Sequence, residues 1–367
     1  MNSPKITFLV NSGPDSIEAV RARGLARQLP PDKTRFLFRE GSRLSTWFRW
    51  DAELKRDRPD LLYVLNTAMP GAALAVWWRR RHGIPYLLDT GDAIHEMARR
   101  SGIQGGWRLP LLWLLEKVSH RDAAVVVVRG TRHREHLVAS GLPRVSVIRD
   151  GYAEQTSATP GSVEKLRRRL GLENRFVVGV MGSLVFSPRL GICYGWDLVR
   201  ALVHLKELPV IGLIIGDGDG KAWLEAEAKA AGVADRVVFC GRIPYAEVPT
   251  YLRLMDVALS TQTNNLPGQV RTTGKLPEYM AAERFILASR VGEAALLLPE
   301  LMLLDYDGEV DNRYPDRLAE RVRLLQSQPE LLEVRRTLPP LAFRECNYDL
   351  LSEKLAELVR GLPNGSR

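Results

Sequence analysis

Short apolar segments of strand length alternate with segments of helix length along the whole chain of 367 residues. Such alternation predicts parallel sheets covered by helices, because parallel neighbours need a crossover that is usually helical. Strands are expected at residues 6–10, 61–66, 86–89, 123–128 and 145–148, and then at 176–181, 210–215, 237–240, 257–260, 285–288 and 301–304. Two successive α/β units fit this pattern better than one, and the chain is long enough for two cores.

A stretch that separates the two halves, residues 151–163, is poor in bulky apolar residues and rich in turn formers. It predicts an interdomain linker, with the boundary near 152–165. The expected first domain is 1–155 and the second is 165–345. Leu351, Leu355 and Leu358 recur at helical spacing and predict a final amphipathic helix within 347–362.

A helix is predicted to begin at Lys275, and its first turn is unusual. Lys275 and Arg271 place positive charge at a helix N-terminus, where it opposes the helix dipole. Gly274 allows close approach of the backbone and Pro277 suits the first turn, so free N–H groups and two cations could converge on a phosphate. Glu278, one turn later, is expected to face the same site. The alternative is a surface helix start whose charges are solvated.

The positive charge of the chain is confined to its first half. Through residue 150 there are 25 Lys and Arg against 15 Asp and Glu, whereas the remainder is nearly neutral, for a net charge of +9. Six of eight tryptophans lie there too: Trp47, Trp50, Trp77, Trp78, Trp107 and Trp113. This composition suits contact with an anionic membrane surface, although tryptophans in the core and solvated arginines explain it equally well. A nucleic-acid partner is not expected, because no DNA- or RNA-binding signature is present.

Composition excludes several other classes. With 45% hydrophobic and 26% charged residues, the chain is typical of a globular protein. No apolar run is long enough to span a bilayer and the N-terminal apolar segment is too short for a signal peptide, so a cytoplasmic location is expected. Three widely spaced cysteines predict neither a disulfide framework nor a zinc site.

The stretch from Lys275 to Ser289 resembles the "K-x-x-E-Y-M-A-x-G-x-P-x-x-x-S" motif of retaining glycosyltransferases of family 4. Further segments are similar to motifs of the same family: 147–151 to the end of the first lobe, 180–183 to the loop that opens the second, and 215–218 with 237–244 to "G-x-G … V-x-F-x-G-x-V-P". The resemblance covers most of the chain. It implies the GT-B fold, in which two Rossmann-like lobes face each other across a cleft and a C-terminal helix crosses back to the first lobe.

The resemblance also implies a donor site for a nucleoside-diphosphate sugar that needs no metal or other cofactor. Charge on the leaving diphosphate must then be stabilised by cations and backbone N–H groups. The resemblance assigns Glu278 to the ribose. The other expected donor-binding residues are Gly13, Gly182, Ser183, Arg189, Arg242, Ile243, Arg271 and Lys275.

On the first lobe, Asp92 and His95 occupy the place of the family's "H-D" segment beside the reacting sugar. Asp92 is the preferred catalytic candidate, orienting the sugar or the acceptor, and His95 is the second. A structural role for Asp92 as a helix cap is the alternative.

The chain departs from the family pattern at three places. The usual first carboxylate of Glu-x7-Glu falls on Val270, the "A-x-G-x-P" turn is replaced at 282–285, and the Arg and Lys that follow the second-lobe glycine are replaced by Ser183 and by Tyr194. Asp217 and Asp219 have the spacing of a metal clamp, but a strand-to-helix turn explains them better.

These features predict a metal-independent hexosyltransferase, peripheral at the cytoplasmic face of the membrane, that uses a UDP- or GDP-sugar. The expected acceptor is lipid-linked or a polysaccharide, in cell-envelope glycan synthesis. Two alternatives remain: a noncatalytic scaffold subunit, which Val270 would favour, and a non-hydrolysing sugar-nucleotide epimerase of the same architecture.

Overall fold

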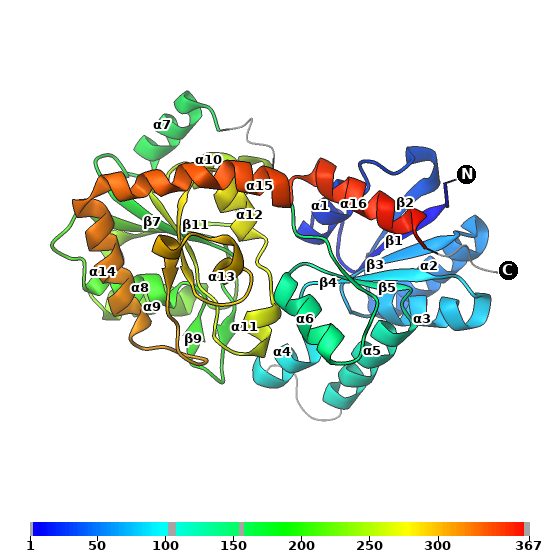
Figure 1. Cartoon of the computed structure of the whole chain (residues 1–367). Coiled ribbons are helices and arrows are strands. Elements are labelled where there is room, and N and C mark those ends of the chain that lie inside the picture. The colour runs from blue at the N-terminus through cyan, green and yellow to red at the C-terminus, as the bar shows by residue number, and fades with distance from the viewer. Residues whose placement is uncertain (1–2, 102–107, 154–157, 363–367) are drawn as a thin grey trace.

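The protein, described here from a computed structural model at residues 3–101, 108–153 and 158–362, has two α/β lobes that lie side by side (Figure 1). The first lobe contains a parallel six-stranded sheet of order β2-β1-β3-β4-β5-β6. Its strands are β1 Ile6–Val10, β2 Thr34–Phe38, β3 Leu61–Leu65, β4 Tyr86–Thr90, β5 Val125–Val128 and β6 Val145–Val147.

The second lobe repeats this architecture with the order β11-β10-β7-β12-β13-β14, again parallel throughout. Its strands are β7 Phe176–Met181, β10 Val210–Ile215, β11 Val237–Gly241, β12 Val257–Ser260, β13 Phe285–Ser289 and β14 Leu303–Leu304. A small antiparallel hairpin of β8 Phe186–Ser187 and β9 Ile192–Cys193 follows β7. The expected GT-B architecture is confirmed.

Helices cover both faces of each sheet, so the strands are buried on both sides and read as apolar runs. The first lobe has α1 Ile17–Leu25, α2 Arg43–Asp57, α3 Gly71–His82, α4 Ile94–Ser101, α5 Arg108–Asp122 and α6 Thr131–Ala139, with a 3₁₀ turn at Pro31–Lys33. Its core is divided by the sheet. One face packs against α1 and the C-terminal helix, and the other packs against α2, α3 and α6.

The second lobe is built around one large core. Its helices are α7 Pro160–Arg169, α8 Trp196–Val203, α9 Lys221–Ala230, α10 Val248–Leu252, α11 Leu266–Val270, α12 Lys275–Ala281, α13 Ala294–Leu297, α14 Tyr314–Ser327 and α15 Leu338–Cys346. Short 3₁₀ turns lie at Ala234–Arg236, Tyr245–Glu247, Glu300–Met302 and Pro329–Thr337. The lobes meet where α11 contacts α6 and α4.

The final helix, α16 Tyr348–Arg360, leaves the second lobe and packs on α1 of the first (Figure 1). Leu351 and Leu355 are buried in the first-lobe core, as their spacing predicted. Tyr348 fills the space above Gly24 and Gly151, where an added Cβ would lie 2.3 and 2.5 Å from its ring. The crossing helix therefore depends on two glycines of the lobe that it covers.

Strands β2, β8 and β9 were not among the expected elements, and the expected linker contains the start of a helix. Strand β2 was not predicted, because it is an edge strand with mostly half-buried side chains and includes Arg35. The expected linker at 151–163 overlaps α7, which begins at Pro160. The Thr159 side chain caps this helix by accepting a hydrogen bond from the Ser162 N–H, and Pro160 occupies the first helical position.

Candidate functional site

Two residues that the sequence placed in separate roles meet across the lobes. Asp92 follows β4 of the first lobe and Arg271 follows α11 of the second, and the Arg271 Nε lies 3.1 Å from the Asp92 Oδ1. The Asp92 side chain is 24% exposed and that of Arg271 is 54% exposed, so solvent reaches the pair. The contact places the preferred catalytic carboxylate beside an expected diphosphate ligand.

His95 is half-buried in the first turn of α4, three residues after Asp92. The start of this helix is held by Glu116 of α5, whose oxygens accept hydrogen bonds from the Ile94 N–H at 2.8 Å and the His95 N–H at 3.0 Å. Burial raises the pKa of Glu116. The sequence analysis missed Glu116, because it is 21 residues from His95 and no local pattern links them.

Lys275 is the first residue of α12, and its ammonium lies 3.6 Å from the centroid of the Tyr194 ring. A Cβ added to Gly182 would lie 3.1 Å from the Lys275 Nζ, so the lysine reaches the loop that opens the second lobe. Burial and the nearby Arg271 charge hold the Lys275 pKa well below its ordinary value. In the described part of the chain, no carboxylate forms an ion pair with this lysine.

Glu278 is buried and faces the segment that joins the lobes. Its carboxylate accepts hydrogen bonds from the Ala153 N–H at 3.1 Å and from the Tyr245 hydroxyl at 2.6 Å. Burial raises the pKa of Glu278 to about 7. Its protein partners are thus different from those of Lys275, although one helical turn separates the two residues.

The remaining expected donor residues are spread around the second-lobe loops. Arg189 pairs with Glu309 at 2.5 Å and donates to the carbonyl oxygen of Arg100 in the first lobe. Ser183 and Arg242 are exposed, and Ile243 packs against the second-lobe core.

Two glycines expected in the donor site differ in their surroundings. The loop at Gly182 packs so closely on Gly216 that a Cβ on Gly216 would lie 1.9 Å from the Gly182 carbonyl oxygen. Gly13, on the first lobe, has open space where a Cβ would stand. A ligand could therefore approach the backbone at Gly13, whereas the Gly216 turn is closed by protein.

Asp217 and Asp219 serve the turn after β10. Asp217 accepts a hydrogen bond from the Gly218 N–H at 2.9 Å, and Asp219 accepts one from the Phe186 N–H at 3.0 Å. Across residues 3–101, 108–153 and 158–362, no three His, Cys, Asp or Glu side chains are grouped so that they could hold a metal ion. Both carboxylates thus have backbone partners in this loop.

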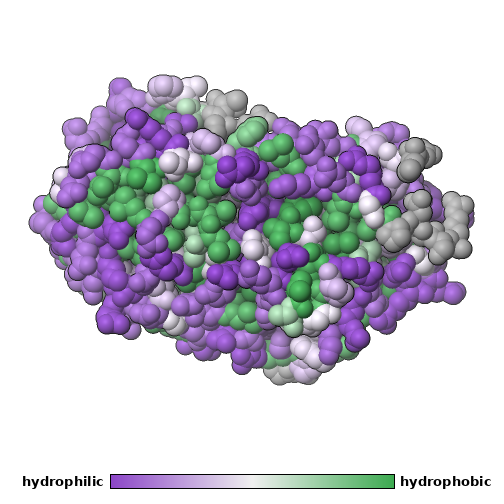
Figure 2. Space-filling view, in the orientation of Figure 1, coloured by the Kyte–Doolittle hydropathy of each residue, from purple (hydrophilic) through white to green (hydrophobic). Residues whose placement is uncertain are grey.

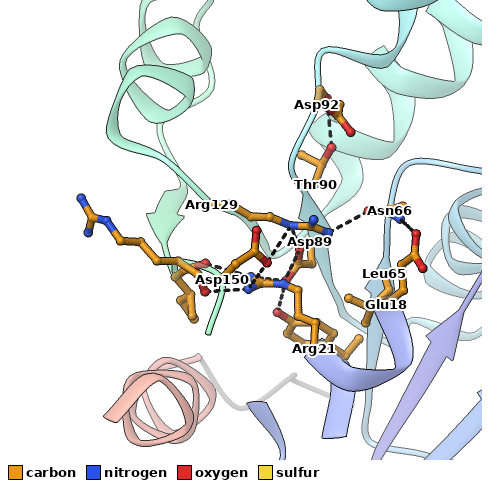
Figure 3. A network of polar contacts seen from close by, with 12 residues as sticks. Glu18, Arg21, Leu65, Asn66, Asp89, Thr90, Asp92, Arg129 and Asp150 are labelled. Carbon is orange, nitrogen blue, oxygen red and sulfur yellow. Dashed lines mark hydrogen bonds and ion pairs between the residues drawn. The ribbon is translucent and has the colours of Figure 1, made fainter. Parts of the chain in front are cut away.

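A buried charged network lies at the carboxyl ends of the first-lobe strands (Figure 3). The Arg21 guanidinium donates to Asp89 at 2.9 Å and to Asp150 at 3.1 Å, and Arg129 approaches both carboxylates. Burial alone would raise the Asp89 pKa, but the two arginines and the Tyr63 hydroxyl lower it. Sequence analysis missed this network, because its members come from five separate segments.

The tryptophans of the first half are divided between core and surface. Trp50 and Trp78 are buried, whereas Trp77 is 38% and Trp113 is 46% exposed. Trp107 lies outside the described residues. Other exposed apolar side chains on α2 and α5 are Leu44, Phe48, Leu111 and Leu114.

Figure 2 shows hydrophobic residues on the displayed face in separate groups, interrupted by hydrophilic ones. The helices within the described ranges are too short or too polar to cross a bilayer.

Two family models match the chain, one for each lobe. Residues 10–151 match the glycosyl transferase 4-like domain, and residues 175–327 match the glycosyl transferases group 1 domain.

Similar curated proteins include 2-deoxystreptamine glucosyltransferase of Streptomyces kanamyceticus, 28% identical over 66% of this chain and 61% of that protein. Another is GDP-mannose-dependent alpha-mannosyltransferase of Mycobacterium tuberculosis, 26% identical over 75% of this chain and 68% of that protein. The alignment to the first relative thus spans less than two thirds of its length.

Solved structures share the two-lobe fold over nearly the whole chain. Anabaena HepE in complex with UDP-glucose aligns with a TM-score of 0.78 and 17% identity, covering 98% of this chain and 100% of that one. WaaG, a glycosyltransferase involved in lipopolysaccharide biosynthesis, aligns with a TM-score of 0.69 and 15% identity, covering 97% and 100%. At these identities, the likeness establishes the architecture.

Proposed function

Because this chain belongs to the group 1 glycosyltransferases, with a glycosyl transferase 4-like domain as its first lobe, we propose that it transfers a hexose with retention from a UDP- or GDP-sugar. The proposed acceptor is a lipid-linked sugar or a polysaccharide in cell-envelope glycan synthesis, and no metal ion takes part. The observation that carries this proposal is the ion pair between Arg271 of the second lobe and Asp92 of the first, together with the buried Lys275 ammonium, which is near enough to Arg271 for that charge to lower its pKa.

In this proposal, Arg271 and Lys275 bind the donor diphosphate. The bond between the sugar C1 and the diphosphate oxygen breaks during transfer, and negative charge builds on that oxygen. Arg271 is exposed enough to exchange Asp92 for a phosphate, and Lys275 lacks an anionic partner in the described residues. Burial disfavours the charged form of Lys275, and a bound diphosphate would favour that form.

Asp92 then orients the sugar or the acceptor hydroxyl, and His95 lies within one turn of it. With retention, the acceptor oxygen attacks the face from which the diphosphate leaves, and a phosphate oxygen accepts the hydroxyl proton. The products are therefore the acceptor joined to the sugar by a new glycosidic bond and the nucleoside diphosphate, which carries the proton from the acceptor hydroxyl. Glu116 is a positioning residue, because it holds the loop and helix that carry Asp92 and His95.

For the remainder of the donor, we propose that Glu278 accepts hydrogen bonds from the ribose hydroxyls and that residues 241–244 contact the base. Anabaena HepE was solved with UDP-glucose, and curated relatives use GDP-mannose. Both nucleotides are therefore candidates. We further propose that exposed Trp77 and Trp113, with the surplus of basic residues, hold the first lobe on an anionic membrane surface at the cytoplasmic face.

A melting-temperature assay with UDP and GDP at millimolar concentration tests the donor site, since a ligand that binds only the folded state raises its stability. One of the two nucleotides is expected to raise the melting temperature of the wild type, and Lys275→Ala is expected to lose that increase. Lys229→Ala, an exposed lysine on α9, is the matched control. If neither nucleotide stabilises the wild type, the proposal fails.

One observation favours the noncatalytic alternative. Val270 replaces the carboxylate that normally touches the sugar, and its side chain is only 2% exposed. A scaffold subunit would show no turnover of a sugar nucleotide. Slow donor hydrolysis by the wild type that disappears in Lys275→Ala would exclude this alternative.

A further inference from the structure

The segments that follow β1, β3 and β4 bring four polar side chains to one edge of the first-lobe sheet, where the strands have their carboxyl ends. Ser12 and Glu18 follow β1, Asn66 follows β3 and Asp92 follows β4. These strands are adjacent, so the segments that follow them are neighbours. Arg271 reaches Asp92 from the second lobe, so this edge faces the lobe that we propose binds the donor. In open α/β sheets, ligands bind at such edges.

Glu18 has an unusual electrostatic position here. In the buried network, two arginines are balanced by two aspartates. Glu18 adds a further carboxylate, and its partners are neutral: the Ser12 hydroxyl at 3.1 Å and the Asn66 amide at 3.2 Å. No Lys, Arg or His in the described ranges lies within ion-pair distance of it. A carboxylate offers about four acceptor sites, so Glu18 retains capacity for donors from a ligand.

The network holds Glu18 and Asn66 in place (Figure 3). Arg129 donates to the Asn66 Oδ1 at 2.9 Å, which turns the amide nitrogen toward Glu18. The Asn66 backbone has a left-handed φ of 66°, and its N–H donates to the Asp89 carbonyl oxygen at 2.8 Å. The buried ion pairs thus preorganise a polar pair that is itself only partly buried.

We propose that Glu18 and Asn66 form an acceptor subsite that binds neighbouring hydrogen-bond donors of a cyclic polyol. This inference rests on the proposed function and extends it to the class of acceptor. The Glu18 carboxylate accepts from a hydroxyl or ammonium group of the ring, and the Asn66 amide orients it. Asp92, on the same edge, is then next to the reacting hydroxyl.

Saturation-transfer NMR with two matched ring compounds, each in the presence of whichever of UDP and GDP raises the melting temperature of the wild type, tests the subsite. The probes are myo-inositol, which offers only hydroxyls, and 2-deoxystreptamine, which adds two amino groups. Both are expected to bind the wild type. Glu18→Gln is expected to weaken binding by about 10- to 100-fold, the range for a hydrogen bond to a charged group. If Glu18→Gln weakens the binding of both probes equally, the Glu18 carboxylate accepts a hydrogen bond from a ring hydroxyl. If it weakens the binding of 2-deoxystreptamine alone, the carboxylate binds an ammonium group.

Asp15→Asn is the matched control, because Asp15 is an exposed carboxylate in the same β1–α1 segment. It is expected to leave binding of both probes unchanged. Asn66→Gly can adopt the same left-handed backbone conformation, and it is expected to weaken the binding of the probes as Glu18→Gln does. The inference is overturned if neither probe binds the wild type in the presence of the nucleotide that raises its melting temperature, or if Glu18→Gln and Asp15→Asn behave alike. Failure of both UDP and GDP to raise the wild-type melting temperature instead counts against the proposed function.

Discussion

Glu293 of the second lobe caps a helix of the first: its Oε2 accepts a hydrogen bond from the Thr131 N–H at 2.7 Å. Thr131 begins α6, whose preceding residue, Gly130, has no side chain for this purpose. Arg149 of the first lobe pairs with the same carboxylate. Because the Glu293 side chain is only 2% exposed, separating the lobes would leave a helix end and a charge without their partners.

Gly130→Ala is expected to disturb this contact between the lobes. A Cβ at Gly130 would lie 2.4 Å from the Thr272 Oγ1 and 2.9 Å from the Glu293 Oε2, whereas its φ of −141° suits alanine. The clash should lower the free energy of unfolding by about 1–3 kcal/mol, as overpacking does. Urea denaturation measures the loss. Gly161→Ala, which meets nothing within 4 Å, should cause none.

Substitutions of Asp92 and Arg271 should have opposite effects on nucleotide binding. Asp92→Asn removes an anion that competes for Arg271, so UDP or GDP should bind about two- to fivefold more tightly, the scale of an exposed ion pair. Arg271→Ala should weaken binding about 10-fold or more. Calorimetric titration distinguishes them, with exposed Arg336→Ala as the control. Weaker binding by Asp92→Asn would contradict a competing role.

Lys275→Met should separate stability from binding. The variant keeps much of the side-chain volume but removes a desolvated amine that lacks a carboxylate partner in the described residues. Its free energy of unfolding at neutral pH should equal or exceed that of the wild type, while stabilisation by the nucleotide is lost. Denaturation with and without the nucleotide measures both quantities. A marked loss of stability without the nucleotide would point to a structural role.

Glu278 should make stability fall as the pH rises. Burial raises its pKa in the folded state to about 7 from an ordinary value of 4.5, so the folded protein binds the extra proton between these values. Its contribution is present below pH 4.5 and declines through pH 7, by about 3 kcal/mol in total. Relative to the wild type, Glu278→Gln should lack this decline in urea denaturation at pH 5 and pH 8. Parallel pH dependence of the two proteins would contradict the shift.

Arg21→Met should be strongly destabilising, because it leaves the buried carboxylates of Asp89 and Asp150 without their main cation. Removal of one partner from a buried ion pair costs about 3–5 kcal/mol. Urea denaturation measures this change. Arg23→Met, on the same helix but exposed, should change the free energy of unfolding by no more than about 1 kcal/mol. Similar values for both variants would show that the network contributes little.

Local sequence was enough to predict most strands and the final helix. A strand such as Val257–Ser260 is buried on both faces of a parallel sheet, so it must be apolar throughout. Edge strand β2 has no such requirement and was missed. Within the candidate site, Arg271 and Lys275 could be associated because Lys275 lies only four positions after Arg271. Glu18, Glu116 and Glu293 could not, because their partners are distant in the chain.

The sequence by itself determined two α/β lobes, the family motifs and the cations that begin α12, because apolar periodicity and helix-end chemistry are local properties. Only the tertiary structure decided that Arg271 meets Asp92, that Glu293 caps α6 and that Glu18 remains without a cation among the described residues. These relationships depend on how two folded lobes and the ends of separate strands are placed in space. Charge pairing acts through distance, which the order of residues does not encode directly.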